Sequence, residues 1–338
     1  MSSFKRTALL LLGVLVIYAQ ISPVAVLGAT SPSSTNGGGQ ALEIGPPLLE
    51  LNGNPGQTIT ASISLRDISS GSLIVSNEIN DFVAKGDSGI PEILFNGSAK
   101  DPYSLKSYIV PLPNFLLKPQ QQKQLQVQIN IPTNASPGGH YGVIRFTGTP
   151  ASLNGKSGVS LSASIGTLVL LTVSGKIVEH LSTSSFYVSQ NINSNASSFF
   201  QNAPLTFSEI VKNDGNEHVI PQGYVTVKDM FGHKVISLIV NIQQGNVLPG
   251  SKRKFSEDMF SKNSPHKRLF GRYTATFSMT YGTPKHTLTD SLSFWVIPVD
   301  LIVVWLVVLI GGFFLIRYML KRYNEHIIGK AQQSKKKK

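Results

Sequence analysis

The chain has 338 residues, no cysteine and a formal net charge of +12. The lack of cysteine excludes disulfides, thiolate chemistry and lipoprotein attachment, and it favours a bacterial or archaeal surface protein. The charge is concentrated at the chain ends, with +2 near the N-terminus and +7 after Ile316. Only +3 remains over residues 29–300, which argues against nucleic-acid binding.

The N-terminus has the pattern of a secretory signal peptide. Lys5 and Arg6 form a charged region, residues 7–21 are mainly apolar, and the small residues Gly28 and Ala29 precede a Ser/Pro/Gly stretch. We therefore predict a signal peptide over residues 1–28, cleaved near Gly28 or Ala29, followed by a flexible leader over residues 29–41. The alternative is an uncleaved N-terminal anchor.

Residues 42–175 are predicted to form a first β-sandwich of immunoglobulin type. Apolar and polar residues alternate with period two, and turn residues separate the segments. Residues 86–102 are read as a polar, turn-rich excursion, and residues 108–117 as an edge strand or extended segment because they contain Pro111 and Pro113. The predicted strands cover residues 48–51, 58–65, 73–83, 125–131, 141–146 and 159–173.

Residues 176–296 are predicted to form a second sandwich, with the boundary at Gly175 and Lys176. Residues 246–250 are read as a turn leading into residues 251–255. The predicted strands include residues 205–211, 224–227, 235–242, 273–279 and 288–296. The fold class is therefore all-β, with two tandem immunoglobulin-like β-sandwiches followed by a single transmembrane α-helix.

The helix is predicted from residues 301–316, an uncharged apolar run inside a longer apolar stretch. We place a transmembrane helix at residues 297–320 and a basic tail at 321–338, so the lipid bilayer is the partner of residues 297–320. The alternative is a buried core helix. Eight Lys or Arg after Ile316 against one acid put the C-terminus in the cytoplasm. This predicts a single-pass type I plasma-membrane protein with an extracellular ectodomain. Gly311 and Gly312 allow helix–helix pairing.

No enzymatic site is predicted. The seven histidines lack metal-site spacing, Gly155-Lys156-Ser157 is interpreted as a hairpin turn rather than a phosphate loop, and no cofactor or metal is expected. Glu257 and Asp258 are interpreted as solvated loop residues rather than a catalytic pair. No catalytic residue is therefore assigned.

Two groups of residues are predicted to bind a partner. The first lies around the Gly-Gly-His-Tyr turn and comprises His140, Tyr141 and Arg145, although an exposed turn residue is the plainer interpretation of His140. The second is a basic cluster that could bind anionic wall polymer, lipid headgroups or an acidic partner, with a solvated loop as the alternative. It comprises Lys252, Arg253, Lys254, Lys267, Arg268 and Arg272.

Several turn motifs carry a resemblance to a known family. They are Asn54-Pro55-Gly56-Gln57, Pro137-Gly138-Gly139-His140-Tyr141-Gly142, the segment 211–218, Pro221-Gln222-Gly223, Asp229-Met230-Phe231-Gly232, Leu248-Pro249-Gly250-Ser251 and Phe270-Gly271-Arg272-Tyr273, together with the early strand residues Leu48, Glu50 and Leu51. With the signal, two sandwiches, anchor and basic tail, the chain resembles the WxL-interacting surface proteins of Gram-positive bacteria, whose modules are similar to pilus chaperones. The resemblance implies a peptidoglycan-binding first domain and a second domain that holds a partner protein.

The expected function is a non-enzymatic, membrane-anchored surface protein. Its ectodomains would bind cell-wall polymer, an exported surface protein or both, with strand addition at an exposed sheet edge as one mode. The alternatives are a chaperone-like assembly factor for exported subunits and an accessory subunit of a membrane complex.

Overall fold

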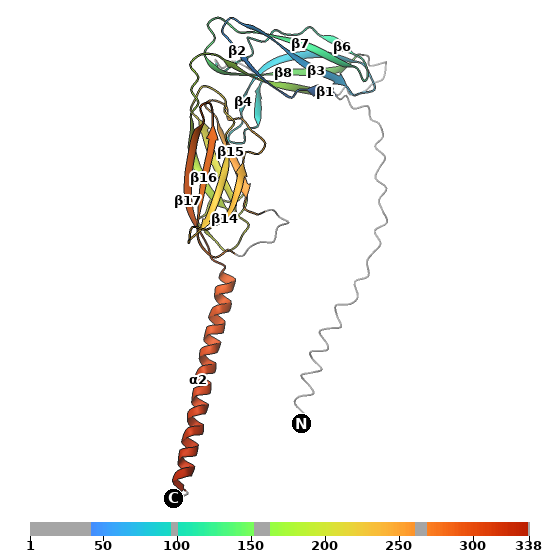
Figure 1. The fold of residues 1–338 in the computed structure, drawn as a ribbon. Helices are drawn as coiled ribbons and strands as arrows, with labels where there is room; N and C mark the ends of the chain where they lie inside the picture. Colours follow the sequence, from blue (N-terminus) through green and yellow to red (C-terminus); the bar gives the residue numbers. More distant parts are fainter. Residues whose placement is uncertain (1–41, 96–100, 152–162, 261–268, 337–338) are drawn as a thin grey trace, which may run out of the picture. The chain divides into compact units, whose positions relative to one another are not determined.

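Two sets of β-sheets follow each other along the chain, and one helix comes after them (Figure 1). The computed structural model describes residues 42–95, 101–151, 163–260 and 269–336. Strands β1 to β9 pair only with one another, as do strands β10 to β17. We call these groups the first and the second sandwich. The all-β class with a single C-terminal apolar helix is thereby confirmed.

The first sandwich contains a sheet of three strands and a sheet of six. The smaller has the order β1 (Leu42–Gly45), β3 (Thr58–Asp67), β7 (Gln122–Asn130). The larger has the order β2 (Leu48–Gly53), β9 (Ala163–Val173), β8 (Gly138–Pro150), β4 (Leu73–Ala84), β5 (Pro91–Leu94), and β6 (Phe115–Leu117) also pairs with β4. The chain therefore changes sheet between β1 and β2.

The core of the first sandwich follows from the alternation in its strands. In β3, Ala61, Ile63 and Leu65 are buried while the intervening polar residues face outward or lie half-buried. Each fully buried Ile or Leu stabilises the fold by about 1.5–3 kcal/mol relative to an exposed one. The predicted strand alternation is confirmed here.

Strand β8 is buried on both of its faces. Ile144 and Phe146 lie in the main core, while Tyr141 and Val143 join a smaller cluster on the opposite face of the sheet. That cluster is completed by Phe82 and Leu170, with Ile93, Tyr103, Leu168 and Leu248 packed against it. The first sandwich therefore has a second apolar surface, which the loop carrying Leu248 contacts.

The second sandwich contains a sheet of three strands and a sheet of five. The smaller has the order β10 (Leu181–Ser189), β12 (Thr206–Asn213), β15 (Lys252–Asp258). The larger has the order β11 (Phe199–Phe200), β17 (His286–Val296), β16 (Gly271–Tyr281), β13 (Gln222–Asp229), β14 (Lys234–Val240). Aromatic rings fill its core, with Phe207 and Phe294 at 5.7 Å between ring centroids.

Three expectations about local structure change. Strand β5 lies inside the predicted excursion 86–102, and only residues 115–117 of the segment 108–117 form a strand. Residues 252–258 form β15 rather than a turn and loop, so Glu257 and Asp258 lie on a strand paired with β12. The predicted turn at Gly155-Lys156-Ser157 and the start of the predicted strand 159–173 lie outside the described residues.

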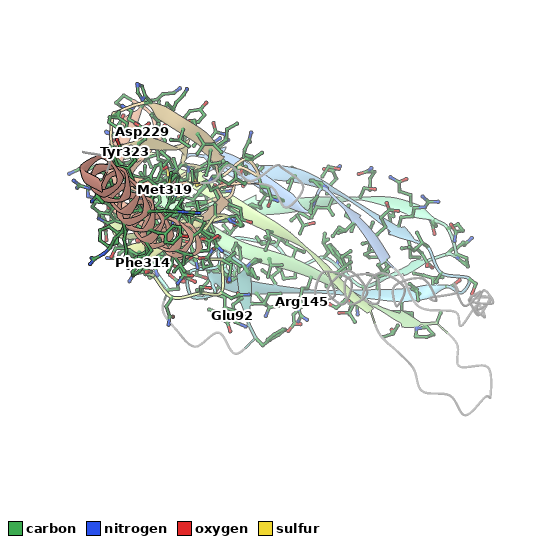
Figure 2. All side chains as sticks on the ribbon, turned by 90° about the horizontal axis from the view of Figure 1, so that it is seen from below. Glu92, Arg145, Asp229, Phe314, Met319 and Tyr323 are labelled. Atoms are coloured by element: carbon green, nitrogen blue, oxygen red, sulfur yellow. The ribbon has the colours of Figure 1, made fainter. Side chains whose placement is uncertain are left out.

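Two residues separate the end of β17 from the start of helix α2 (Val299–Lys336). Within its segment Val299–Asn324, an 18-residue window has a mean hydropathy of 2.8, and the segment is long and apolar enough to cross a membrane. Side chains such as Phe314, Met319 and Tyr323 project from the helix and are exposed (Figure 2). An isolated helix with an apolar surface on all sides is the arrangement expected for a lipid environment.

Candidate partner-binding cleft

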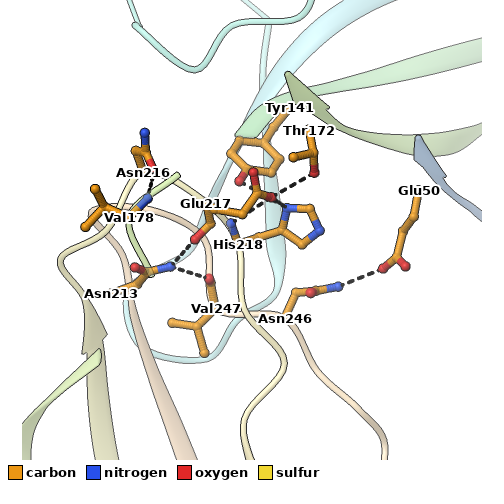
Figure 3. A network of polar contacts seen from close by, with 10 residues as sticks. All are labelled: Glu50, Tyr141, Thr172, Val178, Asn213, Asn216, Glu217, His218, Asn246 and Val247. Atoms are coloured by element: carbon orange, nitrogen blue, oxygen red, sulfur yellow. Dashed lines mark hydrogen bonds and ion pairs between the residues drawn. The ribbon is translucent and has the colours of Figure 1, made fainter. Parts of the chain in front are cut away.

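Asn216 ties the start of β8 to the second sandwich, and Figure 3 shows its bond to Val178. Its backbone oxygen accepts a hydrogen bond from the Gly139 N–H at 2.8 Å. Its side-chain amide donates to the backbone oxygens of Pro137 and Lys176, each at 3.0 Å, and its Oδ1 accepts from the Val178 N–H at 2.7 Å. One side chain thus joins both sandwiches and the segment that connects them.

A second set of polar contacts surrounds Tyr141 (Figure 3). Its hydroxyl and His218 Nδ1 form a hydrogen bond of 3.3 Å, and His218 also pairs with Glu217. Glu217 in turn accepts a hydrogen bond of 3.0 Å from the Thr172 hydroxyl of β9. Burial, reinforced by the negative charge of Glu217, raises the pKa of Tyr141, so the phenol remains neutral and acts structurally.

His140 is not an exposed turn residue, and that expectation is wrong. Its side chain is only 2% exposed, and its ring nitrogens contact the backbone oxygens of Ser136 at 2.9 Å and Ser104 at 3.3 Å. It lies on β8, where both faces of the sheet are covered, so burial follows from the packing described above. His140 is therefore a buried residue that joins neighbouring loops.

Arg145 lies on the same face of β8 as Tyr141 but is already engaged. Its Nε donates to Asn80 Oδ1 at 3.1 Å, it pairs with Glu78, and it lies over the Phe95 ring at 4.8 Å. An arginine with these partners has little free capacity for an external anion.

The predicted basic cluster divides between opposite ends of the second sandwich. Lys252, Arg253 and Lys254 lie on β15, where Lys252 pairs with Lys212 just before the loop that contacts the first sandwich. Arg272 lies on β16 and pairs with Trp295, four residues before α2. Lys267 and Arg268 lie outside the described residues. The structure therefore does not bring the described members together into one site.

Arg253 is half-buried, and its guanidinium is enclosed by two loops. A Cβ added at Gly89 or Gly245 would meet the guanidinium, so it lies between these two loops, and it also lies over the Phe255 ring at 5.7 Å. Its Nη1 donates to the Asn246 backbone oxygen at 2.8 Å. Burial lowers the pKa of Arg253, but a guanidinium remains protonated in proteins.

No carboxylate of the described residues forms an ion pair with Arg253. A guanidinium has five N–H donors. Within the described parts of the chain, the Arg253 guanidinium donates only one hydrogen bond. A half-buried cation without a counter-charge is costly unless a partner supplies an anion.

A cavity of about 250 Å³ lies beside Arg253. Its walls come from β2, β4, β9 and the loop before β15, and a larger hollow of about 490 Å³ shares Phe82 and Leu248. We call the smaller cavity and Arg253 together the cleft. Its apolar lining residues are Leu48, Phe82, Ala84, Pro91, Leu168, Leu170 and Leu248.

Within the described residues, no strand pairs with the first part of β9 on the side where β2 pairs with its second part, and we call this the free edge of β9. Strand β2 pairs only with its second half, from Leu168 to Val173, and the Leu168 N–H donates to the Pro47 oxygen at 2.9 Å. Backbone N–H groups alternate between the two sides of a strand, so the N–H groups of Ser164 and Gly166 point to the same side as that of Leu168. Strand β2 does not extend far enough to pair with them. An extended segment could add there and extend toward the cavity.

The sequence identified Arg253 but not the apolar residues of the cleft. These residues come from separate strands, and only the tertiary fold brings them together. One signal was present: the continuous apolar run at the end of β9 indicates a strand buried on both faces, and the second of those faces is the one that carries Leu168 and Leu170.

No family model and no curated protein matches the chain. Among solved structures it is similar to the class 5 fimbriae chaperone CfaA, with 12% identity over 74% of this chain and 98% of that chain at a TM-score of 0.38. It is also similar to the YadV chaperone, with 9% identity over 75% of this chain and 99% of that chain at a TM-score of 0.36. The E. coli chaperone DraB is similar as well, with 12% identity over 76% of this chain and 97% of that chain at a TM-score of 0.33. At such identities and TM-scores, these similarities do not establish a function for this chain.

Proposed function

We propose that this protein is a non-enzymatic, membrane-anchored binding protein that holds an extended segment of an exported partner protein in the cleft. The observation that carries the proposal is Arg253, a half-buried guanidinium without a carboxylate partner in the described chain, at the edge of an apolar cavity.

The chemistry of the cleft defines what the segment must present. A carboxylate can bind the free N–H groups of Arg253 in bidentate fashion, which is stronger than a neutral hydrogen bond. An apolar side chain nearby can enter the cavity beside Leu168 and Leu170. The backbone of the segment can pair with the free edge of β9, which is the usual mode of strand addition.

The topology of the protein is part of the proposal. We propose that residues 1–28 are a signal peptide, that the sandwiches divide at residues 175 and 176 and lie outside the plasma membrane, and that α2 anchors them. The apolar segment of α2 and the basic residues after Ile316 support this orientation. Cell-wall polymer binding has no support in the described geometry or in the comparisons.

A photo-crosslinking amino acid at Leu168, in the full chain in its native membrane, tests the proposal. We expect adducts with an exported protein, and we expect Arg253→Gln to reduce their yield at least about tenfold, because truncating a buried charge pair costs about 2–5 kcal/mol of binding. Arg253→Lys should retain part of the yield.

The matched control is Arg66→Gln, which removes an exposed arginine from the first sandwich. It should leave the adducts unchanged. Adducts that do not depend on Arg253 would contradict the proposed site, and adducts that carry only wall polymer would contradict the proposed partner class.

A further inference from the structure

Exposed apolar side chains gather at the end of the second sandwich from which α2 continues. We call them the helix-proximal patch: Phe199, Met230, Phe231, Phe270 and Trp295. Phe231 is 76% exposed and Trp295 46% exposed. Exposed apolar residues that lie next to one another usually mark a contact surface, whereas single scattered ones do not.

The strand register places these residues together. Trp295 pairs with Phe199 of β11, and it pairs with Arg272 of β16, which lies two residues after Phe270. At the other side of the sheet, Asp229 pairs with Tyr273, and a Cβ added at Gly271 would meet the tip of Met230. The patch therefore spans the end of the sheet from β11 to the turn after β13.

The first turn of α2 lies close to this end of the sandwich. Only Ile297 and Pro298 separate β17 from α2, and the Ile297 N–H donates to the Phe200 oxygen at 2.8 Å. A hollow of about 300 Å³ is lined by residues of both, among them Ala203, Leu269 and Leu301. If α2 enters a bilayer near Asp300, the patch lies within the headgroup region, which is roughly 5–8 Å thick on each side.

Three exposed basic residues at this end suit a membrane surface, and the carboxylate of Asp258, which also lies there, accepts a hydrogen bond of 2.6 Å from the Thr206 hydroxyl. Lys228, Lys234 and Arg272 are exposed there. The Asp229 carboxylate accepts hydrogen bonds of 2.9 Å from the Phe231 and His233 N–H groups, so its own turn engages it. Aromatic side chains with basic neighbours are typical of protein surfaces at the interface of an anionic bilayer.

We propose that the helix-proximal patch is a second membrane contact, in which its apolar side chains enter the interfacial region of the bilayer that α2 spans. The basic side chains bind anionic lipid headgroups. The contact holds the second sandwich against the membrane surface. The inference rests on the membrane anchor in the proposed function, but it does not depend on the cleft.

The test uses the full chain in vesicles of phosphatidylcholine and phosphatidylglycerol whose acyl chains carry bromine close to the headgroup. In a Trp305→Phe variant, Trp295 is the remaining tryptophan. We expect these lipids to quench Trp295 and expect Phe231→Ser with Phe270→Ser to cause loss of that quenching. Vesicles without phosphatidylglycerol should quench Trp295 less. Equal quenching with and without phosphatidylglycerol would overturn the role of the basic residues.

The matched control places the reporter at the opposite end of the same sheet. Tyr224→Trp, in a chain with Trp295→Phe and Trp305→Phe, puts an exposed tryptophan at the start of β13, and it should not be quenched by lipid. Equal urea midpoints of the serine variant and its parent show that the sandwich still folds.

The failures are distinguishable. In a Trp295→Phe variant, lipids that carry bromine deep in their acyl chains should quench Trp305. Quenching of Trp305 but not of Trp295 overturns the patch contact and leaves the anchor intact. Loss of both overturns the anchor and the patch contact together. A Trp295 shielded from aqueous iodide but not quenched by lipid would mean that protein covers the patch, which also overturns the inference.

Discussion

Replacing Glu209 by glutamine should stabilise the second sandwich at alkaline pH and have a much smaller effect at pH 5. Glu209 lies on β12 and is 2% exposed, and neither carboxylate oxygen has a hydrogen-bond partner in the described structure. Phe207 and Val211, two residues away on either side, belong to the apolar core. The carboxyl group is thus buried where a charge is poorly tolerated.

Burial raises the pKa of Glu209 to about 8, and the negative charge of Asp290 adds to the effect. In the unfolded chain the same group has its ordinary pKa of about 4.3. Between these two values the folded state binds more protons than the unfolded state, so the stability falls as the pH rises. Below pH 4 the group is neutral in both states, and above pH 8 the loss is complete.

At pH 9, we expect the free energy of unfolding of Glu209→Gln to exceed that of the parent by about 3 kcal/mol, and we call this difference the gap. This value is smaller than the one that the full pKa shift would give, because solvent screens part of the interaction. The glutamine amide is neutral at every pH, so the gap should be much smaller at pH 5 and vanish below about pH 4. The measurement is urea unfolding of the full chain in detergent micelles, followed by Trp295 fluorescence in the Trp305→Phe background.

Glu43→Gln is the control, because Glu43 is an exposed carboxylate on β1 of the first sandwich. Its unfolding free energy should match that of the parent at both pH values. A gap for Glu209→Gln that is the same at pH 5 and pH 9 would show that the carboxyl group does not change its protonation in the folded protein.

Strands with one buried face could be predicted from the sequence. A strand such as β15, which has no alternating pattern and forms only because it pairs with a distant strand, was missed. Ile59, Ala61, Ile63 and Leu65 alternate because one face of β3 meets the core, and that pattern is visible in one dimension. Strand β15 has no such alternation, since Phe255 is its one residue in the core. It is a strand because β12 pairs with it along residues 252–258, and a long-range pairing cannot be read from a local pattern.

The candidate site divides in the same way. Charge type is a local property, so Arg253 was recognised from the sequence as part of a basic cluster. Its burial between Gly89 and Gly245, and the apolar walls supplied by β2, β4 and β9, depend on contacts between segments far apart in the chain. For the same reason His140 seemed to belong to a turn, although Gly138 begins a strand that is covered on both faces.

Gly138→Ala should open the contact between the two sandwiches without unfolding either. Gly138 has φ of +116°, a conformation that L residues rarely adopt, and an added Cβ would overlap the backbone oxygen of Asn216. That same oxygen accepts the hydrogen bond from the Gly139 N–H. The backbone strain and the overlap together should cost about 2–3 kcal/mol, which corresponds to a roughly 30- to 150-fold increase in the population of the open contact.

Hydrogen exchange of the full chain, followed by mass spectrometry, measures this opening. Exchange should accelerate in peptides covering residues 138–142 and 213–218, while the core strand with Phe277 keeps its protection. Gly232→Ala is the matched control, because Gly232 has φ of +84° but open space around it, so it adds backbone strain far from the contact. Unchanged exchange in both peptides would show that Asn216 does not hold the sandwiches together.

The same variant connects the contact to the cleft. Residues on both sides of the contact line the cavity, with Leu168 and Leu170 on β9 and Leu248 and Arg253 in the second sandwich. If the contact positions these walls, Gly138→Ala should reduce crosslinking from Leu168 even though Arg253 is unchanged. Full crosslinking in a chain whose contact has opened would mean that the partner segment binds the first sandwich alone, along the free edge of β9.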